Sequence, residues 1–175
     1  VIEAIRNNIT IYSAHTNLDN AAEGVNKQIA NVLGLVNTTP LQDKGNGNGA
    51  GIIGNLPKSI SEQQMLKQLQ ELFKVPAIKH NGELGRSISK VALCGGSGAF
   101  LIPDAVAMGA DIFITGEIGY HRMFDYDGRI KLVELGHYES EQFTIELLYN
   151  KLNTLCNGLK LVKTNVKTNP VNYWI

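Results

Sequence analysis

Short apolar runs alternate with helical apolar stripes through the second half of the chain. Four runs rich in aliphatic and β-branched residues predict strands over residues 91–94, 111–114, 131–135 and 159–162. Apolar residues at helical spacing predict helices over residues 101–108 and 139–155. Since strands alternate with helices, the pattern indicates βα units. We therefore expect an α/β fold with largely parallel or mixed sheets flanked by helices.

The first half of the chain begins with a second kind of pattern. Residues 9–14 are β-branched and aromatic and lead into the polar stretch 15–19, which predicts a strand feeding a loop. Apolar residues then recur at helical spacing over residues 22–33, and Gly34 is suited to end that helix. Residues 1–5 read as the last turns of a helix, so we expect that a preceding segment of the natural chain is missing.

The middle of the first half lacks regular patterning. Residues 35–54 contain a proline and then a Gly/Asn tract, which predicts a linker or lobe boundary. Ser59 and Glu62 have capping-box spacing and predict the start of a helix with an apolar stripe. This organisation predicts two α/β lobes, with residues 1–42 as the C-terminal part of the first and residues 43–175 as the second.

Composition narrows the class of protein. Sixteen basic and sixteen acidic residues give a formal net charge of zero, which gives no signal for nucleic acid or anionic lipid. The two cysteines, Cys94 and Cys156, have no metal-knuckle or disulfide-framework spacing, which favours a reducing, cytoplasmic setting. No apolar run approaches the roughly 20 residues of a membrane helix, so we expect a protein that does not cross a membrane.

The residues that could carry chemistry follow the predicted strands. Ligands of open α/β sheets bind beyond the carboxyl ends of the strands. Four loops there hold most of the reactive side chains: HTNLD at residues 15–19, CGGSG at 94–98, TGEIGYH at 115–121 and GHYESE at 136–141. Three of the four histidines occur in this set, each with a carboxylate nearby. Imidazole and carboxylate together are suitable ligands for a divalent metal ion.

His137 and Glu141 form the sharpest pair because they are four residues apart. If a helix begins by His137, both side chains project from one face and can share a metal ion or adjacent ions. If Ser140 is instead the N-cap, His137 lies in the preceding turn, and the argument that both side chains share one helix face weakens. Asp19 ends the loop after the strand over residues 9–14, so a shared sheet would bring it to the same edge.

Each residue alone also has a structural interpretation. His121 could be a solvated side chain, Asp19 could be the N-cap of the next helix, and His80 beside Asn81 is a turn residue to which we assign no role. Only the joint placement on strand-end loops raises the metal interpretation above these alternatives. The glycines at 95–98 could bind an anion, but Leu101 stands where a dinucleotide fingerprint needs glycine, so a tight strand-to-helix turn is favoured.

Three motifs carry a resemblance to a known family. YSAHTNLD at residues 12–19, TGEIGYH at 115–121 and GHYESE at 136–141 resemble, in order and spacing, those of the NGG-one-interacting-factor-three-like family, whose bacterial members carry the name GTP cyclohydrolase I type 2. The resemblance implies a dinuclear divalent-metal centre with Asp19, His137 and Glu141 as ligands. Glu141, His15 and His121 are the corresponding catalytic candidates.

The resemblance also carries expectations about assembly and reaction. It implies two divalent ions per subunit (zinc, iron, manganese or magnesium), a hexameric ring and a nucleotide or small-molecule substrate. The family's further histidine ligands precede the HTNLD-like motif and have no counterpart here, and an inserted domain would fall near Gln42 and Asp43. Two adjacent metal ions favour hydrolysis. The alternatives are a non-catalytic metal-binding or regulatory protein, and a nucleotide-binding module that uses the glycine loop without metal.

Overall fold

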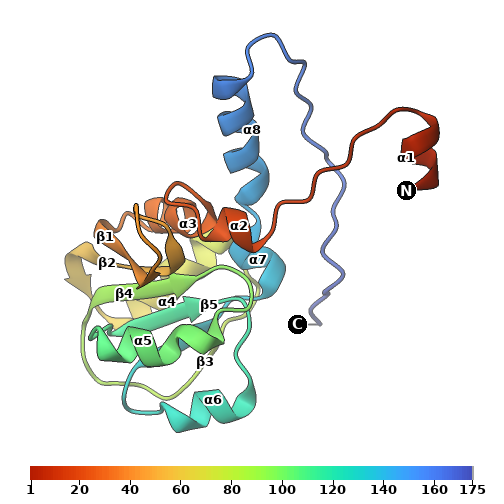
Figure 1. Cartoon of the computed structure of the whole chain (residues 1–175). Helices are drawn as coiled ribbons and strands as arrows, with labels where there is room; N and C mark the ends of the chain where they lie inside the picture. The colour runs from red at the N-terminus through yellow and green to blue at the C-terminus, as the bar shows by residue number, and fades with distance from the viewer. Residues whose placement is uncertain (175) are drawn as a thin grey trace.

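A single mixed sheet forms the centre of the molecule in a computed structural model that describes residues 1–174 (Figure 1). Its six strands are β1 (Val36–Asp43), β2 (Gly49–Ile60), β3 (Lys79–His80), β4 (Ile88–Cys94), β5 (Ile112–Thr115) and β6 (Lys131–Glu134). They lie in the order β1-β2-β4-β5-β6-β3. Strands β4, β5 and β6 are parallel neighbours, while β1, β2 and β3 pair antiparallel with theirs. The expected α/β class with a mixed sheet is confirmed.

Helices cover both faces of this sheet and also lie on segments that extend beyond it. They are α1 (Ile2–Arg6), α2 (Thr16–Asp19), α3 (Val25–Val32), α4 (Glu62–Phe73), α5 (Ile102–Ala107), α6 (Tyr120–Asp125), α7 (His137–Glu141) and α8 (Thr144–Leu155), with a 3₁₀ turn, η1, at Ala99–Leu101. The helix expected over residues 101–108 therefore forms. The one expected over residues 139–155 is divided, because the chain leaves helical hydrogen bonding between α7 and α8.

The core follows the two-residue period of the strands. Side chains such as Val91, Leu93 and Ile114 pack with helices α3 and α4 on one face. The alternate positions Ala92 and Phe113 pack with helix α5 on the other. Strands buried on both faces have apolar residues at consecutive positions, which is why the runs at residues 91–94 and 111–114 could be recognised in the sequence.

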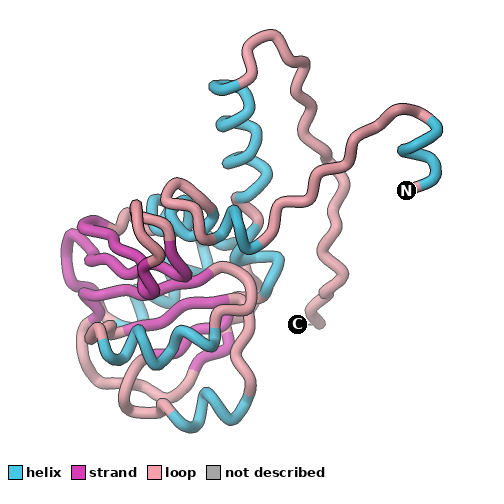
Figure 2. The backbone as a smooth tube through the Cα atoms, viewed as in Figure 1, coloured by secondary structure: helices cyan, strands magenta, loops and turns pink. Residues whose placement is uncertain are grey.

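Two segments extend away from this core. Figures 1 and 2 show α1 on an extended arm formed by residues 7–15, and α8 projecting from the sheet before the chain turns back along residues 157–174. The strands expected over residues 9–14 and 159–162 are therefore wrong. Ile11 and Val162 are 70% and 80% exposed, and neither segment joins the ladder of strands within residues 1–174. A β-branched sequence favours extension, but a strand also needs a hydrogen-bonding partner.

The linker expected over residues 35–54 is also wrong, because this segment supplies most of an antiparallel hairpin. Pro40 lies in β1 at the edge of the sheet, where a missing backbone donor is tolerated. The Gly/Asn tract makes the turn between β1 and β2, with φ of +89° at Gly45, +54° at Asn46 and +75° at Gly47. These positive φ values explain the glycines as turn residues. The division of the chain at residues 42 and 43 stays a prediction.

The start of α4 also differs from the expectation. Ser61, rather than Ser59, is the N-cap, and its hydroxyl accepts a hydrogen bond from the Gln64 backbone amide at 3.2 Å. The Gln64 side-chain oxygen in turn accepts a hydrogen bond from the Ser61 backbone amide at 3.0 Å. The carboxylate of Glu62 does not take part in this capping box. It accepts hydrogen bonds from the backbone amides of Leu84 and Gly85.

A buried lysine at the start of β6 links this strand to α4 and to the residues that follow β3. Lys131, at the start of β6, is 1% exposed, and its Nζ lies 3.2 Å from Glu62 Oε2 on α4. The same ammonium donates to the carbonyls of Asn81 and Gly82. His80 lies in β3, not in a turn, and its Nδ1 is 3.2 Å from Lys131 Nζ. His80 therefore belongs to a structural polar cluster remote from the loops that follow the parallel strands.

Candidate metal and ligand site

The carboxyl ends of the three parallel strands converge on one edge of the sheet. The loop after β4 contacts the loop after β5, since the Gly116 amide donates to the Gly96 carbonyl at 2.8 Å. The loop after β6 contacts both, because the Gly136 amide donates to the Gly116 carbonyl at 3.1 Å and the Ser140 hydroxyl accepts from the Gly96 amide at 2.9 Å. Three of the four candidate loops thus meet as the sheet topology requires.

His137 begins helix α7, with Gly136 as its N-cap. The alternative with Ser140 as the N-cap is wrong. The His137 ring has carboxylates on two sides. Its Nδ1 is 2.6 Å from Glu117 Oε1, and its Nε2 is 3.6 Å from Oε2 of Glu141, which lies one helical turn away. The hydrogen bond with Glu117 is the main cause that raises the pKa of His137 above its ordinary value, against the opposing effect of burial.

Glu117 is a site residue that sequence reasoning missed. The motif TGEIGYH was recognised as a strand-end loop, but no role was assigned to the carboxylate within it. A carboxylate that accepts a hydrogen bond from one ring N–H fixes the tautomer of a histidine and leaves the other nitrogen free as a ligand. The signal was available in the position of Glu117 two residues after β5.

Asp19 ends helix α2 and lies within electrostatic reach of the same pair. Burial raises the pKa of the Asp19 carboxyl, while the charges of His15 and His137 oppose that shift. Burial likewise raises the pKa of Glu141, and the charge of Asp19 adds to the increase. The helix that follows Asp19 has Gly24 as its N-cap, so the capping interpretation of Asp19 is wrong.

A buried amide connects Asp19 to the strand-end loops. The Asn26 side chain, 3% exposed, donates to the Asp19 carbonyl at 3.0 Å and accepts from the Gly95 amide at 2.9 Å. This contact places α2 beside the loop after β4 although no strand precedes Asp19. Even so, within residues 1–174 no group of three or more His, Cys, Asp or Glu side chains is close enough to hold a metal ion. A shared site for Asp19, His137 and Glu141 stays a prediction.

The two other histidine candidates differ in their surroundings. His15 is the N-cap of α2, and its Nδ1 lies 3.0 Å from the Thr16 hydroxyl. Its charge opposes the rise in the pKa of both Asp19 and Glu141. His121 is exposed on α6 and packs edge-on against Tyr120 at a ring-centroid distance of 5.5 Å. Among the described residues no hydrogen bond or ion pair joins His121 to His137 or Glu141.

The glycine loop after β4 is a tight turn in which the amides of all three glycines already donate hydrogen bonds. The Gly95 amide donates to Asn26, the Gly96 amide to Ser140 and the Gly98 amide to the Thr115 hydroxyl at 2.9 Å. An anion cradle needs free amides, so the turn interpretation is favoured. Cys94, which precedes the loop, is a buried free cysteine. Burial raises the pKa of its thiol to about 12, with the charges of Asp19 and Glu141 adding to the effect.

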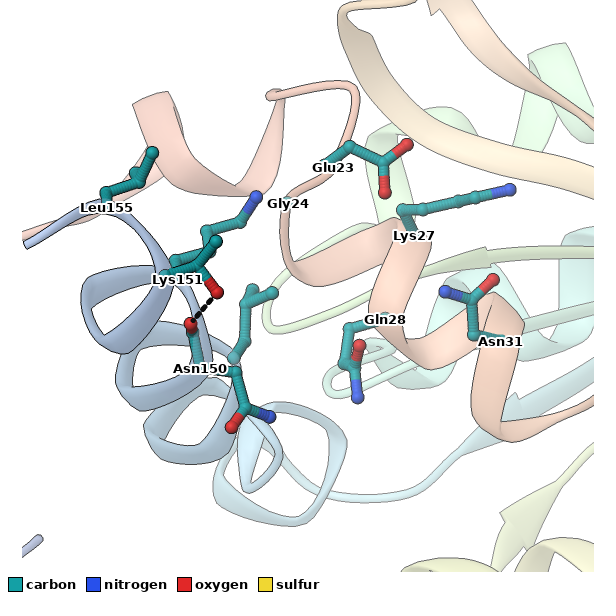
Figure 3. A pocket seen from close by; sticks show the side chains of 10 residues that line it. Glu23, Gly24, Lys27, Gln28, Asn31, Asn150, Lys151 and Leu155 are labelled. Atoms are coloured by element: carbon teal, nitrogen blue, oxygen red, sulfur yellow. Dashed lines mark hydrogen bonds between the residues drawn. The ribbon is translucent and has the colours of Figure 1, made fainter. Parts of the chain in front are cut away.

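Three cavities lie near this part of the molecule. One of about 600 Å³ adjoins His137 and Glu141 and is bordered by the C-terminal segment through residues 168–173. Another, about 340 Å³, lies between α3 and α8 and is drawn in Figure 3, with Lys27 on one wall and Lys151 on the other. None of the candidate site residues lines this second cleft. A third cavity, of about 200 Å³, is lined by Asp19 and Asn26, so the candidate ligands border the first and the third.

No helix in the described range of residues is both long and apolar enough to cross a bilayer. Cys94 and Cys156 are free thiols, in agreement with the absence of a disulfide framework.

Similar proteins identify the family. A GTP cyclohydrolase 1 type 2 homolog of Streptococcus pneumoniae is 40% identical over 142 residues, which cover 78% of this chain and 53% of that protein. One from Lactococcus lactis is 33% identical over 175 residues, 97% of this chain and 66% of that protein. The chain thus spans about half to two thirds of the length of these relatives.

Solved structures agree on the fold. The Staphylococcus aureus hypothetical protein SA1388 superposes with a TM-score of 0.89 at 23% identity, over 99% of this chain and 71% of that one. Reduced HcgD from Methanocaldococcus jannaschii gives 0.69 at 26% identity, over 87% of this chain and 60% of that one. The sequence profile of Duf34/NIF3 (NGG1p interacting factor 3) matches residues 1–170. The chain therefore belongs to the Duf34/NIF3 family, as its three motifs predicted.

Proposed function

We propose that the chain carries part of a divalent-metal site at the carboxyl edge of the sheet and that the site serves a hydrolytic reaction. The observation that carries the proposal is the placement of His137 between two carboxylates, with Nδ1 2.6 Å from Glu117 and Nε2 facing Glu141 at 3.6 Å. Histidine ligands of metal ions typically have such a carboxylate on the nitrogen opposite the metal.

Gly96 lies directly beside two of the proposed ligands. A methyl group on its Cα would lie 3.2 Å from His137 Nε2 and in still closer contact with Glu141 Oε1. The absent side chain thus lets His137 and Glu141 lie against the loop after β4, where a larger residue would displace both. Imidazole nitrogen with carboxylate oxygen suits zinc, iron or manganese, and carboxylates alone suit magnesium. Asp19 is the third proposed ligand, brought near by Asn26.

Each residue then has a defined task in the proposed reaction. Glu117 holds the His137 ring, Glu141 and Asp19 provide anionic oxygen, and His15 lies close enough to influence both carboxylates. A divalent ion at this site would act as a Lewis acid that activates water for hydrolysis. By family resemblance we extend the proposal to two ions per subunit, to His121 as a further catalytic group and to a hexameric ring. The relatives named GTP cyclohydrolase 1 type 2 homolog make GTP the first substrate to test.

Metal analysis of the purified protein tests this proposal. We expect bound zinc, iron or manganese that falls at least tenfold in His137→Ala and Glu141→Ala. It should not change in Glu146→Ala, which removes a 53% exposed glutamate on α8 that pairs with Lys163. Hydrolysis of GTP and other nucleotides should follow the metal content. Variants with an unchanged metal complement would refute the site, and stoichiometric metal without turnover would refute the hydrolase and leave a metal-binding protein.

A further inference from the structure

The cavity beside His137 has an apolar wall as well as a polar one. Its volume of about 600 Å³ is that of a site for a ring-containing small molecule. Tyr138 and Ile145 contribute from α7 and α8, and Pro170, Val171 and Tyr173 contribute from the C-terminal segment. Aromatic and aliphatic side chains on both sides favour a flat apolar ring between them.

The C-terminal segment is held against this cavity by specific contacts. Asn169 Nδ2 donates to Glu139 Oε1 at 2.8 Å, and Glu139 is only 8% exposed. A methyl group on Gly136 would lie 3.4 Å from the Tyr173 hydroxyl oxygen, so the tyrosine reaches the N-terminus of α7. Residues 168–173 therefore form a wall of the cavity even though most of the preceding segment extends away from the core.

Acidic side chains outnumber basic ones in the described lining of this cavity, where His137 is the only basic group. Glu117, Glu139 and Glu141 border the cavity, and none of its described lining residues is Lys or Arg. Lys79, whose charge influences the pKa of Tyr173, is already paired with Glu134. A nucleoside triphosphate would bring about four negative charges against these carboxylates, and like charges without counter-ions repel.

We propose that this cavity binds an uncharged or cationic small molecule with a flat apolar ring, and that its side chains disfavour ligands with a polyphosphate group. The proposal names the ligand class of the site described above and rests on the proposed function only for the reaction that follows binding. Lining residues of the C-terminal segment, Val171 in particular, supply contact with the ring.

Matched probes test the charge preference. Naphthalene and indole, each carrying a hydroxymethyl, aminomethyl or carboxylate group, would be titrated into the protein by ligand-observed NMR and calorimetry, with GTP as the polyphosphate probe. In protein freed of metal with EDTA, we expect the neutral and cationic members to bind at least fivefold more tightly than the carboxylates and GTP. Measurement without metal separates this result from the metal proposal, in which a bound cation would itself attract GTP.

A pair of substitutions on one segment locates the binding. Val171→Asn should weaken the neutral probes about fivefold by removing apolar contact, whereas Val162→Asn, at an 80% exposed position outside the cavity, should not. Glu139→Gln should reduce the difference in affinity between the aminomethyl and the carboxylate probes. Absence of binding by every probe, equal binding of anions, loss of binding with EDTA, or equal effects of the two valine substitutions would each overturn the proposal.

Discussion

Gly96→Ala tests whether the space beside His137 Nε2 holds a metal ion. Gly96 has φ of +63°, and its Cα faces the His137 and Glu141 side chains. An added methyl group would lie 3.2 Å from His137 Nε2, below the usual contact distance for carbon, and closer still to Glu141 Oε1. Both proposed ligands would have to move to relieve the contact.

The expected effect of Gly96→Ala has two parts, a loss of folding stability from the backbone and a loss of metal affinity from the steric contact. A non-glycine residue with left-handed backbone costs about 1 kcal/mol of folding free energy. The steric part acts on the ligands and should lower metal affinity by about 10–100-fold, the effect of disturbing groups that orient a metal site. Gly109→Ala is the matched control because Gly109 has φ of +71° and no atom within 4 Å of the added methyl group.

Calorimetric zinc titration and thermal unfolding of both variants check this reasoning. Both should lose about 1 kcal/mol of stability, and only Gly96→Ala should lose metal affinity. If Gly96→Ala binds zinc as tightly as Gly109→Ala, then the region between the loop after β4 and helix α7 does not hold the ion, and the assignment of His137 and Glu141 as ligands is wrong.

Three other predictions follow from named contacts. Burial alone would raise the pKa of Glu62, but hydrogen bonds from Lys131 and backbone amides outweigh it and place the pKa below 4.5; the stability it contributes is therefore present above about pH 4.5 and lost as pH falls through the lowered pKa. Glu62→Gln should lower the free energy of unfolding by about 3 kcal/mol at pH 7, because it leaves Lys131 charged and buried without a partner. In urea unfolding at acid pH, the variant and the unsubstituted protein should differ less. Glu117→Gln should lower the pKa of His137 in NMR titration of the metal-free protein; an unchanged value would contradict their hydrogen bond. Phe73→Ala should cost about 3–5 kcal/mol in urea unfolding because the ring is 1% exposed; a loss below 1 kcal/mol would contradict the core assignment.

The sequence predicted the parallel part of the sheet because its strands are buried on both faces. Residues 91–94 are all apolar, and apolar residues occupy three of four positions over 111–114 and three of five over 131–135, a density typical of buried strands. The β1–β2 hairpin was missed because Pro40 and the Gly/Asn tract were taken to exclude strands. Proline is acceptable at a sheet edge and glycine is required in a turn with positive φ, so these residues mark the hairpin and do not break it.

The opposite error occurred where composition favours strands but no partner is present. Residues 9–14 and 159–162 have β-branched side chains, yet each is an exposed extended segment among the described residues. Pairing is a tertiary property that periodicity cannot reveal. For the site, helical spacing correctly placed His137 and Glu141 on one face of α7, whereas the contact between His137 and Glu117 depends on how two adjacent loops meet.

The candidate site is assembled by a buried polar network as much as by its own ligands. The Ser140 hydroxyl, 2% exposed, accepts from the Gly96 amide and donates to the His137 carbonyl, both at 2.9 Å. Thr115, fully buried, accepts from Gly98 and donates to the Gly96 carbonyl at the same distance. Because both hydroxyls are buried, breaking either contact would leave an unsatisfied polar group at a cost of about 1–3 kcal/mol. The loop after β4 is therefore fixed to β5 and to α7, and this fixed loop holds Gly96 against the His137 and Glu141 side chains, which are two of the proposed metal ligands.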